Sequence, residues 1–269
     1  MKSILTIQDL SCVGRCSLTV ALPVLSAMGC QCSVLPTAVL STHTGFPDPE
    51  IIPLTDHIPS IGKHFASIGV RFDAVTVGYL ADPAQAEAVL SLLRHYKAQG
   101  SQIIVDPAMG DHGKLYRGLP ADHVSAMLAV CREADVILPN VTEACLLTGI
   151  PYQELSDPDF LQKLTRAMLE IAPAAVITGV SEKAGSIGFC GGCPENHYFC
   201  YETAVIPRQF HGTGDLFAAV FSGGLLDDKS VYDAAAAAAD FVKLCVAGTE
   251  SVTPYGVEFE NQLPRLMKG

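Results

Sequence analysis

Short β-rich segments alternate with longer helical segments along most of this chain. The expected strands are residues 3–8, 32–40, 74–78, 103–106, 136–138 and 175–178, and the expected helices are residues 15–28, 55–67, 83–99, 121–133, 141–148, 159–171, 214–226 and 231–247. Strands that alternate with helices are joined by right-handed crossovers, which gives a mostly parallel sheet with helices on both faces. Two later β-rich segments, 185–190 and 198–205, flank the sequence GGCPEN and predict an antiparallel hairpin at one edge. The sequence therefore predicts an α/β fold.

The composition favours one folded domain over residues 1–269. Hydrophobic residues make up 49% of the chain and charged residues 17%, which supplies a core and excludes a disordered chain. We find no linker, low-complexity segment or repeat that would divide it. The net charge of −11 disfavours nucleic acid and anionic membranes as partners. A nucleotide stays possible, because backbone N–H groups can hold phosphates inside an acidic protein.

The sequence also predicts a cytoplasmic protein. It contains no run of about 18 apolar residues that could cross a membrane. The apolar run near Met1 is too short for a secretory signal. The ten cysteines are therefore expected to be reduced and buried, and not paired in disulfides.

The motif HGTGD at residues 211–215 precedes an apolar helical segment. The backbone N–H groups of Gly212, Thr213 and Gly214 could form an anion hole, because the first turn of a helix leaves its N–H groups free. Asp215 could then act as a carboxylate base. A tight turn followed by an acid that the helix dipole favours is the alternative, and these residues alone leave both open.

Three further acids are candidate ligands for a magnesium ion. Asp106 and Asp111 flank a glycine-containing loop after an expected strand, where two carboxylates could order Mg²⁺ and its waters. Asn140 and Glu143 have the spacing of a helix capping box. Glu143 could in addition bind a water of the metal. A solvated loop and a simple helix cap are the alternatives.

The loop after the expected strand 32–40 carries polar groups beside an aromatic residue. It contains His43, Thr44, Gly45 and Phe46. In parallel α/β sheets, ligands bind beyond the carboxyl ends of the strands, so this loop could line a small-molecule pocket. A turn without such a role is the alternative.

The spacing of four residues in the expected hairpin resembles a zinc knuckle. These residues are Cys190, Cys193, His197 and Cys200. A zinc site needs four ligands that converge tetrahedrally, whereas Cys190 and Cys200 lie in the two arms of the hairpin. We therefore expect a hairpin that binds no stoichiometric zinc.

Taken in order, these motifs resemble the ribokinase-like superfamily and, within it, the pyridoxal (vitamin B6) kinases. GTGD at residues 212–215 is the signature of the superfamily. The other matching segments are Ile7-Gln8-Asp9, Val13-Gly14-Arg15, residues 41–45, DPAMGD at 106–111 with Gly113-Lys114-Leu115-Tyr116, PNVTEA at 139–144, and Thr178. The resemblance covers essentially the whole chain and is therefore more specific than any single motif.

The resemblance implies a kinase that transfers phosphate from ATP to the 5′-hydroxyl of pyridoxal, and of pyridoxine or pyridoxamine. Asp215 would be the base and also contact the substrate, while the backbone of 212–214 would stabilise the transferring phosphoryl group. The implied ATP-binding residues are Asp111, Glu143, Thr178 and Lys183, and the implied Mg²⁺ ligands are Asp106, Asp111 and Glu143. The implied contacts to the vitamin are Asp9, His43, Thr44, Gly45 and Tyr116, the last on a mobile flap. A homodimer is implied as well.

Two residues depart from the family pattern. Asp9 stands where the familiar pyridoxal kinases have Ser. An acid there could pair with the pyridine N–H⁺ or the 3-hydroxyl, or it could cap the turn 11–15. Leu138 stands where relatives have a Thr that helps hold a monovalent cation, so activation by K⁺ is left open.

Three other functions compete with this interpretation. A hydroxymethylpyrimidine kinase of thiamine synthesis shares the fold, but many of these enzymes carry Cys in place of Asp215. A sugar kinase usually has an early Gly-Gly motif, which we do not find. A non-catalytic protein that binds vitamin B6 or zinc needs neither Asp215 nor the acids at 106 and 111, so the presence of these three acids disfavours this alternative.

Overall fold

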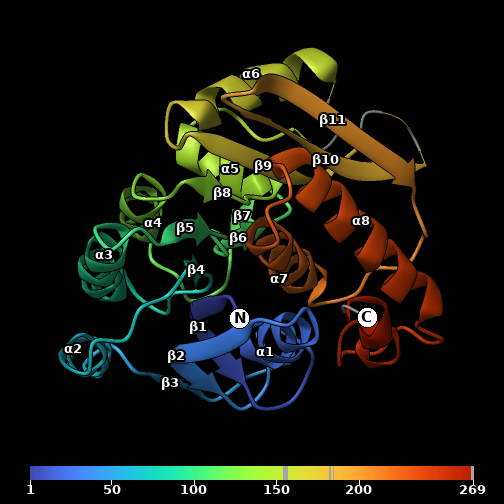
Figure 1. Cartoon of the computed structure of the whole chain (residues 1–269). Coiled ribbons are helices and arrows are strands. Elements are labelled where there is room, and N and C mark those ends of the chain that lie inside the picture. Colours follow the sequence, from blue (N-terminus) through green and yellow to red (C-terminus); the bar gives the residue numbers. More distant parts are fainter. Residues whose placement is uncertain (154–156, 182, 184, 268–269) are drawn as a thin grey trace.

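A nine-stranded sheet runs through the described part of the computed structural model, which covers residues 1–153, 157–181, 183 and 185–267 (Figure 1). The strand order is β11-β10-β9-β8-β5-β4-β1-β2-β3. The parallel strands are β2 (Gln31–Leu40), β1 (Ser3–Ser11), β4 (Ala74–Val77), β5 (Gln102–Val105), β8 (Val136–Ile137) and β9 (Ala174–Val180). The antiparallel strands are β10 (Ser186–Cys193) and β11 (Asn196–Ala204) at one edge and β3 (Ile51–Pro53) at the other. The predicted α/β fold with its edge hairpin is confirmed.

Helices cover both faces of this sheet (Figure 1). One face packs against α1 (Leu18–Ala27), α7 (Thr213–Leu226) and α8 (Val231–Gly248), and the other against α2 (Ile58–Ser67), α3 (Pro83–Lys97), α4 (His123–Cys131), α5 (Val141–Thr148) and α6 (Pro158–Leu169). In β1, Leu5 and Ile7 pack into the core on the α2–α6 side, while Ile4 packs into the core on the other side. A strand buried on both faces is apolar at successive positions, which is why Ile4, Leu5 and Ile7 show no alternation with exposed polar residues.

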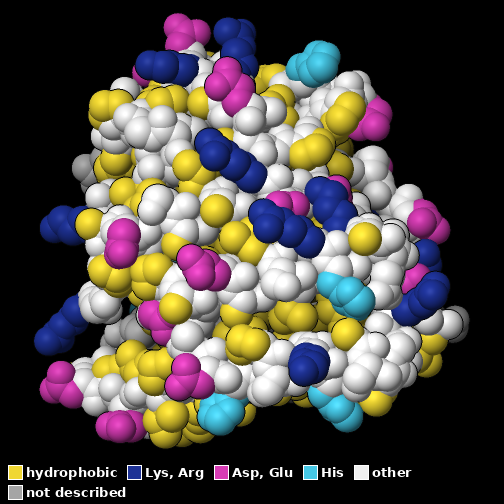
Figure 2. Space-filling view, turned by 90° about the vertical axis from the view of Figure 1, so that its left-hand side faces the viewer, with side chains coloured by type: hydrophobic (Ala, Val, Ile, Leu, Met, Phe, Trp, Pro, Cys, Tyr) yellow, Lys and Arg dark blue, Asp and Glu magenta, His cyan; other side chains and the backbone are white. Residues whose placement is uncertain are grey.

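The outer surface over α2, α3 and α4 carries Lys and Arg side chains interspersed with Asp and Glu (Figure 2). Arg94 of α3 pairs with Glu133 at 2.9 Å on this side of the molecule.

Within the described residues, no helix is both long and apolar enough to span a bilayer. The chain closes with a short 3₁₀ helix, η1 (Glu260–Arg265).

Four features differ from the sequence predictions. The edge strand β3 lies in a segment to which we assigned no element, and a small hairpin, β6 (Gly110–Asp111) with β7 (Lys114–Leu115), lies in a segment that we expected to be a loop. Strands of two or three residues are too short to show a period-2 pattern. β1 continues to Ser11 with a register shift between Gln8 and Leu10, so the prediction that Asp9 follows the strand is wrong. The first helix begins at Leu18 and not at residue 15.

Candidate active site

The segment 211–215 forms the start of α7, as the sequence predicts. Gly212 is the N-cap and has a φ of 80°, which is a left-handed conformation that favours glycine. A side chain at this position would collide with the carbonyl oxygen of Arg15. Gly214 is exposed, and a Cβ there would meet no described atom within 4 Å. The first turn of α7 is therefore open to solvent at Gly214.

Asp215 and Asp106 line the same small cavity beneath this turn. The cavity has a volume of about 20 Å³, room for about one water molecule. Its other polar lining residues are Thr6, Gln8, Thr76 and Ser222. Burial raises the pKa of Asp215 to about 7, with a further contribution from the charge of Asp9 and an opposing one from a hydrogen bond of the Ser17 backbone. Burial and the nearby charge of Asp215 raise the pKa of Asp106.

The β6–β7 hairpin brings Asp111 and Tyr116 to this cluster of acids. Tyr116 follows the hairpin, and its N–H donates to the carbonyl of Met109 at 2.9 Å. Burial raises the pKa of Tyr116, and so do the charges of four nearby acids: Glu143, Asp106, Asp111 and Asp215. Asp111 itself is exposed and lies 3.5 Å from the His112 ring. Four of the five sequence-predicted acids, all except Asp9, thus lie near enough to Tyr116 for their charges to raise its pKa.

Glu143 forms the capping box that its spacing predicts. The side chain of Asn140 accepts from the Glu143 N–H at 2.9 Å, and the Glu143 carboxylate accepts from the Asn140 N–H at 2.9 Å. The same carboxylate also accepts from the N–H of Met109 at 3.0 Å and, more weakly, of Gly110 at 3.4 Å. Glu143 is 2% exposed, and its burial together with the charge of Asp106 raises its pKa. Both of its oxygens are bound to backbone groups.

Asp9 is likewise buried and bound within the chain. The hydroxyl of Ser17 donates to one carboxylate oxygen at 2.5 Å, and that of Ser11 donates to the other at 2.9 Å. Burial raises the pKa of Asp9 although these two bonds oppose the shift. This geometry fits the structural alternative, in which Asp9 fixes the turn before α1. Its contact with a pyridine ring stays a prediction.

The loop 41–46 lies beside the start of α7. His43 is buried, and its Nδ1 accepts from the Gly45 N–H at 3.1 Å while Nε2 contacts the Pro254 carbonyl at 2.6 Å. Because a carbonyl only accepts, the His43 proton is on Nε2. The His43 and His211 rings lie 4.5 Å apart between centroids. Thr44 and Gly45 are exposed at the surface of this loop.

Two of the four expected ATP-binding residues lie in and after β9, which continues two residues beyond the predicted strand end at Thr178. Thr178 is partly exposed, and its N–H donates to the Pro139 carbonyl at 2.9 Å, next to the capping box of α5. Lys183 has an exposed side chain in the connection between β9 and β10. Its carbonyl accepts from the Ser181 and Ser186 hydroxyls at 3.1 and 2.8 Å.

The four residues with knuckle-like spacing do not converge. Cys190 packs into the core on the α2–α6 side of the sheet, whereas Cys193 packs into the core on the α7–α8 side. Cys200 is directly opposite Cys190 across the β10–β11 ladder. Ligands on opposite faces of a sheet cannot share one tetrahedral ion. Zinc content stays a prediction for the purified protein.

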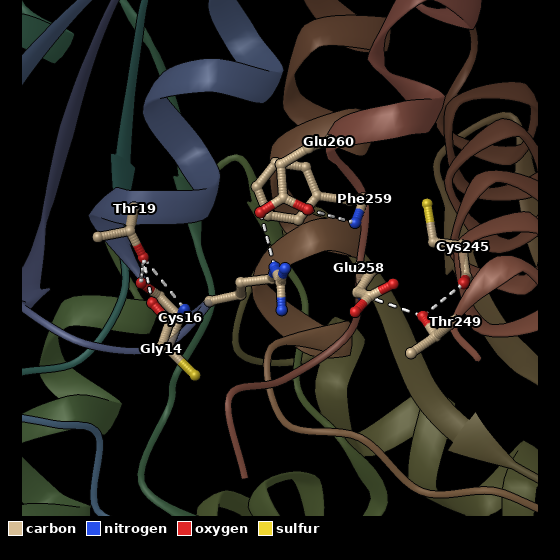
Figure 3. A network of polar contacts seen from close by, with 9 residues as sticks. Gly14, Cys16, Thr19, Cys245, Thr249, Glu258, Phe259 and Glu260 are labelled. Carbon is tan, nitrogen blue, oxygen red and sulfur yellow. Dashed lines mark hydrogen bonds and ion pairs between the residues drawn. The ribbon is translucent and has the colours of Figure 1, made fainter. Parts of the chain in front are cut away.

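The C-terminal segment packs against the residues that precede α1 (Figure 3). The Arg15 guanidinium pairs with Glu260 at 2.6 Å, and both side chains are partly exposed. The Arg15 N–H also donates to the Tyr255 carbonyl at 2.8 Å. The Arg15 carbonyl lies against Gly212. These contacts therefore fix the backbone segment on which the first turn of α7 packs.

Sequence reasoning missed two residues that organise the site. Ser17 donates its hydroxyl to Asp9 and its backbone N–H to Asp215. A serine directly before an apolar helical run is a common N-cap signal, so this residue could have been found. Thr142 binds the N–H of Gly113 at 2.9 Å. No local pattern indicates that contact, since it joins two segments that are distant in the sequence.

A family model described as phosphomethylpyrimidine kinase matches residues 22–257. The chain belongs to this family, within its pyridoxal kinase group and with the ribokinase-like fold. It is therefore a transferase, as the motifs predict.

Solved structures agree with this assignment. The pyridoxal kinase from Lactobacillus plantarum is 34% identical, with a TM-score of 0.90 and a match over 99% of this chain and 96% of that one. A candidate phosphomethylpyrimidine kinase from Bacteroides thetaiotaomicron, crystallised with pyridoxal, is 33% identical, with a TM-score of 0.94 over 98% and 95% of the two chains. Among curated relatives, the pyridoxine/pyridoxal/pyridoxamine kinase of Bordetella bronchiseptica is 28% identical over 88% of this chain and 85% of its own length.

Proposed function

We propose that this enzyme transfers the γ-phosphoryl group of ATP to the 5′-hydroxyl of pyridoxal, and also accepts pyridoxine and pyridoxamine. The observation that carries the proposal is the position of Asp215. Asp215 lies in the first turn of α7, which is open to solvent at Gly214, and burial raises the pKa of its carboxyl to about 7. A proton acceptor next to an anion hole is the combination that phosphoryl transfer to an alcohol needs.

Asp215 acts as the general base. An alcohol is a weak nucleophile, so the attacking oxygen must lose its proton as the new P–O bond forms. A carboxylate with a pKa of about 7 is ionised in a large fraction of molecules at neutral pH and still accepts a proton readily. The N–H groups of Gly212, Thr213 and Gly214 stabilise negative charge on the transferring group without rearrangement.

The acids near Tyr116 have the donor chemistry for a hydrated Mg²⁺ ion. Among the described residues, no group of three His, Cys, Asp or Glu side chains converges on one point. Mg²⁺ typically keeps several waters and takes one or two carboxylates from the protein, and Asp106 and Asp111 would hold it in this way. Bound Mg²⁺ supplies positive charge that offsets the charge of the phosphates. Glu143 fits a supporting role, because its oxygens are taken by backbone N–H groups.

The remaining residues would contact the two substrates. Thr178 in β9 and Lys183 in the connection after β9 would bind ATP. His43 has both ring nitrogens bound to backbone groups, so it shapes the vitamin pocket while the exposed Thr44 and Gly45 line it.

A hydroxymethylpyrimidine (phosphate) kinase is the second candidate, because the matching family model is described as phosphomethylpyrimidine kinase. A coupled assay with purified chain, ATP and Mg²⁺ should compare pyridoxal, pyridoxine, pyridoxamine and hydroxymethylpyrimidine, with the Asp215→Asn variant as the blank. We expect the highest kcat/KM for one of the three B6 vitamers. If hydroxymethylpyrimidine exceeded all three, the second candidate would replace the first.

A further inference from the structure

The β6–β7 hairpin is too small to hold its own shape. Each strand has two residues, and the turn between them consists of His112 and Gly113, with φ values of 49° and 75°. Even a longer isolated hairpin is only marginally stable in water. The position of Asp111 and Tyr116 must therefore be fixed by contacts outside the hairpin.

Those contacts come from the first turn of α5. At the base of the hairpin, the Asn140 side-chain amide donates to the Gly110 carbonyl at 2.8 Å, and Glu143 accepts from Met109 and Gly110. At the far end, the N–H of Gly113 donates to the hydroxyl of Thr142 at 2.9 Å. The base is thus held by the two residues that also form the α5 capping box, whereas α5 binds the turn through the Thr142 hydroxyl.

The Thr142 hydroxyl is enclosed. Thr142 is 2% exposed. The Tyr152 ring packs beside Gly113 so closely that a Cβ on this glycine would lie 2.8 Å from the ring. The turn is therefore in contact with both a buried hydroxyl and an aromatic ring.

We propose that Thr142 is a positioning residue, whose hydroxyl latches the β6–β7 turn to α5 and so holds Asp111 and Tyr116 over the acids of the site. The role of that hairpin in turnover rests on the proposed function, whereas the latch itself does not. The resemblance implies a mobile flap here; the latch instead keeps the hairpin docked before any ligand binds.

The latch predicts a specific kinetic pattern. Without the hydroxyl, the hairpin spends more time undocked, and only the docked fraction is competent to bind. Apparent affinity falls with that fraction, so KM rises while kcat of the bound complex stays within about twofold. A residue that touched the phosphates directly would instead lower kcat.

Limited proteolysis tests the latch without any need for activity. Lys114 and Arg117 are exposed trypsin sites within and just after the hairpin. Thr142→Val keeps the size of the side chain but removes the acceptor, and Thr142→Ser is the matched control that keeps the hydroxyl. We expect cleavage at these two sites to be about fivefold to tenfold faster in the valine variant, the usual worth of one hydrogen bond. The serine variant should match the wild type, and the midpoint of thermal unfolding should be similar for all three.

Cleavage of the valine variant within twofold of the wild type would overturn the latch. Should that variant fail to fold, hydrogen exchange on the wild-type protein decides. The Gly113 amide should then be protected from exchange by at least about tenfold, and exchange at the rate of an unstructured peptide would refute the proposal. Neither result depends on the identity of the substrate. A working latch in an enzyme that ignores B6 vitamers would overturn the proposed function alone.

Discussion

Two pairs of acids in the candidate site differ in the number of hydrogen bonds that their carboxylates accept. Asp9 accepts from two serine hydroxyls, and Glu143 accepts from three backbone N–H groups. Asp215 accepts a bond from one backbone N–H, and within the described part of the chain no group donates to the Asp106 side chain. Burial raises the pKa of all four acids, so burial alone does not separate them.

The difference indicates what each pair can do. A carboxylate whose oxygens are bound to the chain fixes the backbone or side chains that donate to it. A buried carboxylate that accepts one hydrogen bond or none has little to offset its charge, so it retains the capacity to take a proton or a cation. We therefore propose that the number of accepted hydrogen bonds separates the acids that react, Asp106 and Asp215, from the acids that support the fold, Asp9 and Glu143.

The largest expected effect comes from replacing Asp215. Asp215→Asn removes the base but keeps the size of the side chain, so we expect turnover to fall by about 10²–10⁴-fold. Binding of ATP, measured by calorimetry, and the circular dichroism spectrum should not change. Turnover within about threefold of the wild type would remove Asp215 from the reacting pair.

The pH dependence should follow the ionisation of Asp215. Because the base works only when ionised and its pKa is about 7, kcat/KM for pyridoxal should rise about tenfold per pH unit below neutrality and level off above it. Stability should change in the opposite direction. Between the usual value of 3.8 and about 7, the folded state holds a proton that the unfolded chain has lost, so the unfolding free energy falls as pH rises. A flat rate profile from pH 5.5 to 8 would contradict this assignment.

Replacing Glu143 should affect stability more than chemistry. In Glu143→Gln, the amide nitrogen cannot accept, so at least one buried backbone N–H loses its partner. We expect a loss of about 1–3 kcal/mol in unfolding free energy, measured by urea denaturation. The matched control is Asp106→Asn, which should not lower the unfolding free energy, because it removes a buried charge that no hydrogen bond from the described residues stabilises. Equal losses in the two variants would erase the distinction between the pairs.

Asp9→Ser gives a smaller change of the same kind. The shorter side chain no longer spans the Ser11 and Ser17 hydroxyls, and the unfolding free energy should fall by about 1 kcal/mol. The ranking of pyridoxal, pyridoxine and pyridoxamine by kcat/KM should stay as it is. A change of about tenfold in that ranking would show that Asp9 contacts the ring and belongs with the reacting acids.

The smallest effect concerns the ion pair between Arg15 and Glu260 (Figure 3). Its side chains are 27% and 50% exposed, and such pairs contribute about 0–1 kcal/mol. Glu260→Gln should therefore lower the unfolding free energy by less than about 1 kcal/mol. A loss of several kcal/mol would mean that the C-terminal segment depends on this pair as strongly as the hairpin depends on Glu143.

The sequence was informative where a local pattern matches a local structure. The capping box at Asn140 and Glu143, the start of α7 at Gly212 and the alternation of strands with helices all depend on residues close together in the chain. The sequence gives only a weak indication of the β6–β7 hairpin, since the His112-Gly113 turn is its only local signal.

The bonding state of the acids was not predictable from the sequence. Glu143 meets Met109 across 34 residues, and Ser17 meets Asp9 after a bulge that no period reveals. These contacts arise when crossovers bring strand ends together. The motifs identify the acids, whereas their hydrogen bonds, which separate reacting from supporting residues, depend on the folded chain.

The central claim is that hydrogen-bond saturation divides the four acids by role. Its most direct test measures kcat/KM for pyridoxal and the unfolding free energy side by side in Asp106→Asn, Asp215→Asn, Asp9→Asn and Glu143→Gln. We predict that the first two lose at least about tenfold in kcat/KM without any loss of unfolding free energy, because Asn removes a buried charge that the fold does not stabilise. The last two should lose about 1–3 kcal/mol of stability and keep kcat within about tenfold. Four variants that lost activity and stability in the same proportion would contradict the claim.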